Sequence, residues 1–230
     1  MHFEQVLMRG RVVMLWLLAL GMFRALAADP TRFEKEIASI EAAQVVLPDG
    51  ASPIVFAGSS SFRMWKSLAD DLKGFPVINR GFGGSHMSDL NHYAARLVLP
   101  LKPAQIFVYE GDNDLNDGKS PEVVLADCQA FVAMVRTELP GVRVTFLAVK
   151  PSPSRAKLLD TQRKVNQLLR DWTATDRRLA FLDVFTPMMG ADGQPRPELF
   201  GPDKLHMNAE GYALWTRLVR ARLAQPKTEN

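Results

Sequence analysis

Cysteine is almost absent from this chain of 230 residues, since Cys128 is the only one. A single cysteine excludes an internal disulfide, and with only four histidines the chain also lacks the pattern of a zinc cluster. Cys128 shares a helical face with Val124, Phe131 and Val135. We therefore expect a buried core thiol rather than a reactive one.

The chain also lacks a block of basic residues. Its net charge is +3, and most of that excess comes from Arg9, Arg11 and Arg24 at the amino end, so we expect no nucleic-acid partner. A dinucleotide fingerprint fails because His86 stands where "GFGGSH" would need its last glycine, and no P-loop lysine is present. The acidic stretch "DNDLNDG" (112–118) departs from the calcium-loop spacing, so a metal site is not expected.

Long hydrophobic runs are missing too. The apolar segment 12–23 is twelve residues long, against the roughly 20 that a membrane-spanning helix needs. It follows two arginines and precedes "ALA" at 25–27, an order typical of a secretory signal peptide. We predict cleavage near Ala27, export to the periplasm or beyond, no stable membrane insertion afterwards, and a single domain over 28–230. Retention of residues 1–27 as an anchor is the alternative.

The remaining sequence alternates short apolar runs with segments of helical period, and its 47% hydrophobic residues can bury a substantial core. Helices are expected over 31–46, 87–97, 121–139, 158–172 and 209–223, with Ser120 and Asn208 as caps. Strands are expected at Ile54–Ala57, Val77–Asn79, Gln105–Glu110, Val142–Val149 and Leu179–Val184. This alternation predicts a three-layer α/β/α sandwich around a five-stranded parallel sheet.

Polar motifs stand just after the predicted strands, where ligands bind in such sheets. They are "GSSS" (58–61), "RGFGGSH" (80–86) and "GDND" (111–114), and "GPDKLH" (201–206) precedes the last helix. "GSSSF" fails the G-x-S-x-G nucleophile elbow because Phe62 replaces the second glycine. Serine catalysis in another geometry would still need a base, a group that orients it, and oxyanion donors.

Four histidines compete for the role of base. His2 would leave with the signal peptide, His92 fits an exposed helical position, and His86 fits either a substrate contact or loop filling. His206 follows Asp203 by three residues, a spacing that lets a carboxylate orient an imidazole. The alternative is that both residues only shape a turn before the helix capped by Asn208.

Taken together, these motifs resemble the SGNH (GDSL-type) hydrolase family. Its four blocks occur here in order, from residue 54 to about 220. The resemblance implies a flavodoxin-like SGNH hydrolase fold and places the nucleophile on Ser60. It also implies an oxyanion hole from Ser60, Gly84 and Asn113, and a triad completed by Asp203 and His206.

One departure from the family is Ser59, which stands where the usual G-D-S motif has aspartate. Two further segments, "KPSPSR" (150–155) and "PRPELF" (195–200), look specific to this branch and have no assigned role beyond positioning loops.

The resemblance implies a serine esterase that cleaves carboxylic esters through an acyl-enzyme on Ser60, without a metal or organic cofactor. Acetylated glycans, short-chain esters and lysophospholipids all fit as substrates, and a monomer is expected. The alternative of a different class is a secreted, non-catalytic carbohydrate- or lipid-binding module on the same fold. A flavodoxin-like nucleotide binder shares the architecture, but the sequence has no phosphate loop for it.

Overall fold

A computed structural model describes residues 29–44 and 50–225, so the predicted signal peptide lies outside the described residues. The chain divides into two units, residues 1–34 and 35–230. The described part of the first unit contains a 3₁₀ turn, η1 (Pro30–Phe33). Asp29 caps this turn, because its Oδ1 accepts the N–H of Thr31 at 2.9 Å. In the part of the chain that the structure describes, no helix has the length and apolarity to cross a membrane.

A five-stranded parallel sheet organises the second unit, in the order β2-β1-β3-β4-β5. The strands are β1 (Ile54–Gly58), β2 (Val77–Gly81), β3 (Gln105–Tyr109), β4 (Arg143–Leu147) and β5 (Leu179–Leu182). Every residue of β1 and β3 is buried, as expected of central strands that are covered on both faces. The predicted three-layer sandwich and its five strands are confirmed.

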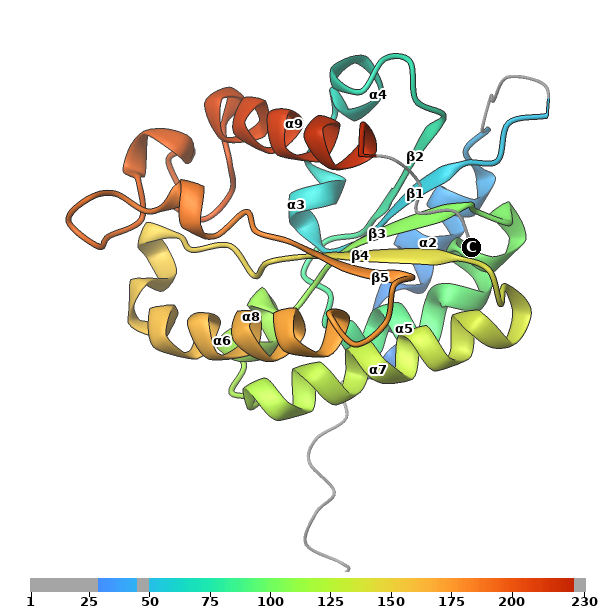
Figure 1. Cartoon of the computed structure of the whole chain (residues 1–230), viewed down its shortest axis with the longest axis horizontal. Coiled ribbons are helices and arrows are strands. Elements are labelled where there is room, and N and C mark those ends of the chain that lie inside the picture. Colours follow the sequence, from blue (N-terminus) through green and yellow to red (C-terminus); the bar gives the residue numbers. More distant parts are fainter. Residues whose placement is uncertain (1–28, 45–49, 226–230) are drawn as a thin grey trace, which may run out of the picture. The chain divides into compact units, whose positions relative to one another are not determined.

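Helices cover both faces of this sheet (Figure 1). One face carries α5 (Met87–Leu97), α7 (Pro121–Glu138) and α8 (Leu159–Thr173), and the other carries α3 (Ser60–Arg63), α4 (Leu68–Asp71) and α9 (Ala209–Leu223). The remaining elements are α2 (Glu34–Ala42), α6 (Asp112–Asn116) and the 3₁₀ turns η2 (Leu99–Leu101), η3 (Pro153–Leu158), η4 (Thr186–Met188) and η5 (Pro197–Leu199).

Both predicted helix caps are present. Ser120 accepts the N–H of Val123 at the start of α7, and Asn208 Oδ1 accepts the N–H groups of Glu210 and Gly211 at the start of α9. Each bond satisfies first-turn donors that an α-helix leaves without a backbone acceptor.

Three strands and the first helix are shorter than the sequence predicts, β3 by one residue, since it ends at Tyr109 rather than Glu110. β4 ends at Leu147 because the N–H and C=O of Val149 bond to the Asn166 side chain, at 2.7 and 3.0 Å, instead of a neighbouring strand. β5 ends at Leu182 because Asp183 accepts the N–H groups of two following residues and turns the chain. The helix predicted over 31–46 begins only at Glu34, after the 3₁₀ turn, and ends at Ala42.

An aromatic core fills the space between the sheet and the helices α3 and α9. Phe62, Trp65 and Trp215 are at most 1% exposed, and their ring centroids lie 6.1 to 6.5 Å apart. Phe82 is fully buried against Tyr93. Their burial places these four aromatics in the core rather than at the border of a substrate site.

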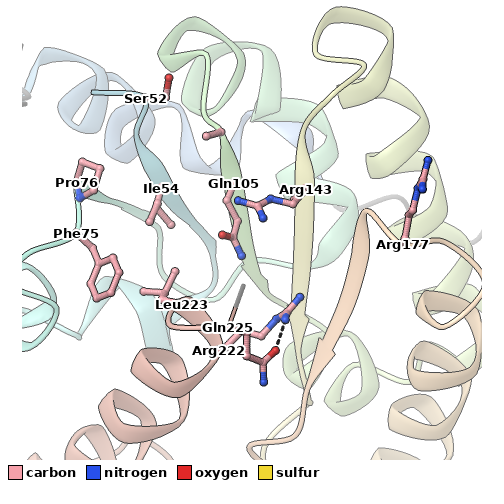
Figure 2. A pocket seen from close by; sticks show the side chains of 11 residues that line it. Ser52, Ile54, Phe75, Pro76, Gln105, Arg143, Arg177, Arg222, Leu223 and Gln225 are labelled. Carbon is pink, nitrogen blue, oxygen red and sulfur yellow. Dashed lines mark hydrogen bonds between the residues drawn. The ribbon is translucent and has the colours of Figure 1, made fainter. Parts of the chain in front are cut away.

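A cavity of about 720 Å³ lies at the amino ends of the strands. Figure 2 shows Ile54, Gln105 and Arg143, which begin β1, β3 and β4, around it together with Leu223 at the end of α9. The polar motifs found in the sequence follow the carboxyl ends of strands, so this cavity is separate from the site they form.

Candidate active site

Ser60 sits at the point where β1 passes directly into α3. Gly58 ends the strand with φ +141°, and a Cβ at this position would lie only 2.1 Å from the carbonyl oxygen of Tyr109. Only glycine fits both constraints, so the chain can turn sharply here against the neighbouring strand. Ser59 then donates its N–H to Tyr109 at 3.0 Å, and Ser60 begins the helix.

The loop before α9 brings His206 to this serine. His206 Nε2 lies 3.0 Å from Ser60 Oγ, although 146 residues separate them in sequence. On the other side of the ring, His206 Nδ1 lies 2.6 Å from Asp203 Oδ2. Because a carboxylate accepts from the Nδ1–H, Nε2 is left as the nitrogen that accepts the Ser60 hydroxyl.

Asp203 is held by its own loop. Its Oδ1 accepts the N–H groups of Leu205 and His206, both at 2.9 Å. Desolvation works to raise the pKa of Asp203, but the bonds from the His206 ring and these two N–H groups outweigh it and lower the pKa to about 2. The carboxylate is therefore charged at neutral pH and available to orient the imidazole.

Asn113 lies on α6 beside this chain of groups. Its Nδ2 donates to Ser59 Oγ at 2.9 Å and to the carbonyl of Ser85 at 3.0 Å. Gly84, which adjoins Ser85, adopts φ +74°, a backbone conformation that favours glycine. The N–H of Ser60 belongs to the first turn of α3, where an α-helix supplies no backbone acceptor. Ser60, Gly84 and Asn113 are the residues that the motifs named as oxyanion donors, and in this structure the Asn113 N–H groups are donated to Ser59 and Ser85.

The sequence profile of the GDSL-like Lipase/Acylhydrolase family matches residues 48–214, most of the chain. The chain belongs to this family. It is therefore a hydrolase, and the α/β fold that it adopts is that of the GDSL/SGNH hydrolases.

Individual proteins agree with this assignment. Platelet-activating factor acetylhydrolase IB subunit alpha1 from Bos taurus is 27% identical over 194 residues, which cover 79% of each chain. A GDSL-like lipase from Bacteroides thetaiotaomicron superposes with a TM-score of 0.69 at 18% identity, over 85% of this chain and 98% of that one. A carbohydrate esterase family 3 protein from Talaromyces cellulolyticus gives a TM-score of 0.57 at 16% identity, over 75% and 96% of the two chains.

Ser59, which replaces the aspartate of the G-D-S motif in this GDSL-family hydrolase, makes a side-chain contact beside Ser60. Ser59 is 2% exposed, and its hydroxyl oxygen accepts the Asn113 amide. A short hydroxyl thus occupies the position of the family aspartate and still supplies an acceptor for Asn113. The side chain does not cap α3.

The other two described histidines have different surroundings. His86 precedes α5, and its Nε2 lies 2.9 Å from Asp117 Oδ2, so it is bound into the loop rather than directed at Ser60. His92 is exposed on α5, as its helical position predicts. Cys128 is buried, and burial raises the pKa of its thiol well above the ordinary value.

The motifs do not indicate the ionisable groups Glu110 and Lys150, which lie near the site. Glu110 follows β3, is fully buried, and accepts the Ser85 hydroxyl at 2.6 Å, while burial raises its pKa well above the ordinary value. Lys150 is 1% exposed and donates to the carbonyl of Leu205, next to His206, at 2.9 Å. Their only sequence signal is a charge at the end of a buried strand.

Proposed function

We propose that this hydrolase is a serine esterase that cleaves carboxylic esters through an acyl-enzyme on Ser60. One observation carries the proposal: Ser60 Oγ, the His206 ring and the Asp203 carboxylate form a continuous chain with contacts of 3.0 and 2.6 Å. This is the arrangement in which a base removes a serine proton while a carboxylate orients that base.

The reaction follows from these contacts. Ser60 Oγ attacks the ester carbonyl carbon as His206 Nε2 takes the hydroxyl proton. The tetrahedral intermediate collapses, the bond to the alcohol oxygen breaks, and His206 returns the proton to the leaving alcohol. Water then attacks the carbonyl carbon of acyl-Ser60 as His206 takes its proton, the bond from this carbon to Ser60 Oγ breaks, and His206 returns the proton to Oγ, which releases the carboxylic acid and the free serine.

Negative charge on the carbonyl oxygen would be stabilised by the N–H groups of Ser60 and Gly84 and by the Asn113 amide. Removal of one donor of this kind typically lowers kcat by about two to three orders of magnitude. No step of this scheme requires a metal or an organic cofactor.

The substrate class is narrowed by the relatives. One similar protein is named as an acetylhydrolase, which favours a small acyl group such as acetyl over a long acyl chain. The alcohol part stays open among glycans, short alcohols and lysophospholipids. Export as a monomer, without a nucleic-acid partner or stable membrane insertion, rests on the sequence alone and remains part of this proposal.

The mature protein should be incubated with a fluorophosphonate probe, together with Ser60→Ala and Ser61→Ala. We expect covalent labelling of the wild type and of Ser61→Ala, and none of Ser60→Ala, because it is the Ser60 hydroxyl that contacts His206 Nε2. Hydrolysis of p-nitrophenyl esters of increasing acyl length, run in parallel, should be fastest for acetate.

Labelling of folded Ser60→Ala would reject Ser60 as the nucleophile. A folded wild type that neither labels nor turns over any ester would favour the non-catalytic binding module instead.

A further inference from the structure

The segment "KPSPSR" (150–155) returns to the candidate active site after leaving β4. Its backbone is tied to the loop that carries His206, since Ser154 donates its N–H to the carbonyl of Lys204 at 3.0 Å. The 3₁₀ turn η3 then directs Arg155 at Asn113, and the Arg155 side chain is only 11% exposed. A cation thus lies beside one of the three proposed oxyanion donors.

Arg155 contacts the Asn113 amide on the side opposite to Ser59. Its Nη2 donates to Asn113 Oδ1 at 2.9 Å. A guanidinium has hydrogen-bond donors only. It therefore cannot accept a hydrogen bond from the Asn113 amide nitrogen, and the amide must turn its oxygen toward Arg155. The Ser85 carbonyl imposes the same orientation from the other end, where it accepts the amide nitrogen at 3.0 Å.

Arg155 and Lys150 both lie against the carboxylate of Asp112. Asp112 Oδ2 lies 2.9 Å from Arg155 Nη1 and 3.5 Å from Lys150 Nζ, and all three side chains are largely buried. Asp117 and Asp203 also act electrostatically on Arg155 and on Lys150, respectively. The Arg155 guanidinium, largely buried beside Asn113, favours negative charge nearby, which in the proposed reaction develops on the carbonyl oxygen.

We propose that Arg155 is a positioning residue for oxyanion stabilisation, because it holds the Asn113 amide oxygen on its own side, keeps the N–H groups on the side of Ser59 and polarises them as donors. This inference rests on the proposed function. A donor bonded to the amide oxygen strengthens the amide as a donor at its other end. Arg155 acts through Asn113 and does not contact the substrate.

A purely structural role would be the competing explanation, because Arg155 also pairs with Asp112. Asp112 retains other partners, however: Lys150 Nζ at 3.5 Å and Gln162 Nε2 at 3.4 Å. Loss of Arg155 therefore leaves no uncompensated buried carboxylate. The two explanations differ in whether the effect of Arg155 depends on Asn113.

The test is a double-mutant cycle of Arg155→Met and Asn113→Ala, assayed with p-nitrophenyl acetate. We expect Arg155→Met to lower kcat by about tenfold to about a hundredfold with little change in KM, because the interaction strengthens only in the transition state. In the Asn113→Ala background, the same change should cost less than about twofold. Arg155→Lys should lie between, since an ammonium supplies charge without the planar fork.

Arg136→Met is the matched control, because Arg136 is a partly buried arginine with a single ion pair, to Asp176 at 2.6 Å. It should leave kcat and KM near the wild-type values. Thermal denaturation of each variant checks the fold. If Arg155→Met does not fold, Arg155→Lys and Arg155→Gln complete the same cycle.

An unchanged kcat in folded Arg155→Met, or the same loss with and without Asn113, would overturn the inference. Failure of the proposed function looks different. In that case Ser60→Ala keeps its turnover and probe labelling, whatever Arg155→Met does. An inactive Ser60→Ala beside a fully active Arg155→Met rejects the role of Arg155 alone.

Discussion

Asp203 has surroundings from which a pH dependence of protein stability can be predicted. Three hydrogen bonds from Leu205 and His206 converge on its carboxylate, although the side chain is half exposed. These bonds exist only in the folded loop, and they favour the charged form, so the pKa falls from 3.8 to about 2 on folding. A group whose pKa is lowered in the folded state contributes stability above its unfolded pKa and loses it as pH falls through the folded value.

We therefore expect the wild type to be more stable to unfolding than Asp203→Asn above about pH 4. This advantage should be lost as the pH falls from 3.8 to about 2. Thermal denaturation of both proteins from about pH 5 to about pH 2 measures this difference, and NMR titration of the Asp203 carboxyl checks the assignment. A difference that stays constant down to about pH 2 would contradict the expected titration.

At the scale of elements, the site depends on how tightly one strand end passes into a helix. β1 reaches Ser60 without an intervening loop, and this is possible because Gly58 has no side chain where β1 meets β3. Hydrogen bonds join the neighbouring connections to one another. The Asp114 carboxylate, for example, accepts the N–H of Met87 at the start of α5. Ser60, Asn113 and His206 therefore lie on connections that rigid elements hold in place.

Gly58→Ala should destabilise the protein by more than about 2 kcal/mol, because the φ of +141° is strained for alanine and the new Cβ would lie 2.1 Å from a backbone oxygen. The matched control is Gly141→Ala, where no atom lies within 4 Å of the added Cβ and the φ is not positive. Urea denaturation of both variants gives the comparison. Equal stabilities would show that the strand end adapts more freely than its geometry indicates.

On the scale of the whole sheet domain, the aromatic core joins parts of the chain that are distant in sequence. Trp215 on α9 is fully buried, and its ring contacts Phe62 and Trp65 beside the proposed nucleophile as well as Tyr109 on β3. Tyr212, one turn earlier, donates its hydroxyl to the carbonyl of Ser61 at 2.9 Å. The last helix therefore supports the start of α3 directly.

Trp215→Ala should lower the free energy of unfolding by about 3 to about 5 kcal/mol, a large part of the roughly 5 to 15 kcal/mol that a domain usually has. The rate of ester hydrolysis should also fall, since the removal of the Trp215 ring leaves a new cavity behind α3. Val123→Ala is the control, because Val123 is a large apolar residue that is 46% exposed on α7. Denaturant midpoints that match in the two variants would refute the supporting role of Trp215.

The sequence by itself determined the class of fold, the five strands, the main helices and the two caps, because these follow from local periodicity and from side chains that bond within one turn. It also named Ser60, Gly84, Asn113, Asp203 and His206 through short motifs. Strand ends were less predictable, because β4 ends where Asn166, on the following helix α8, takes the backbone bonds of Val149.

Only the tertiary structure decided which side chains meet. The contact of Ser60 with His206 joins residues that are 146 positions apart, and the bonds of Arg155 and Ser59 to Asn113 join separate loops. The same holds for the burial of Glu110 and Lys150, whose charges alone would place them at the surface. Such contacts depend on the register of the sheet and the packing of its loops, which no local pattern encodes.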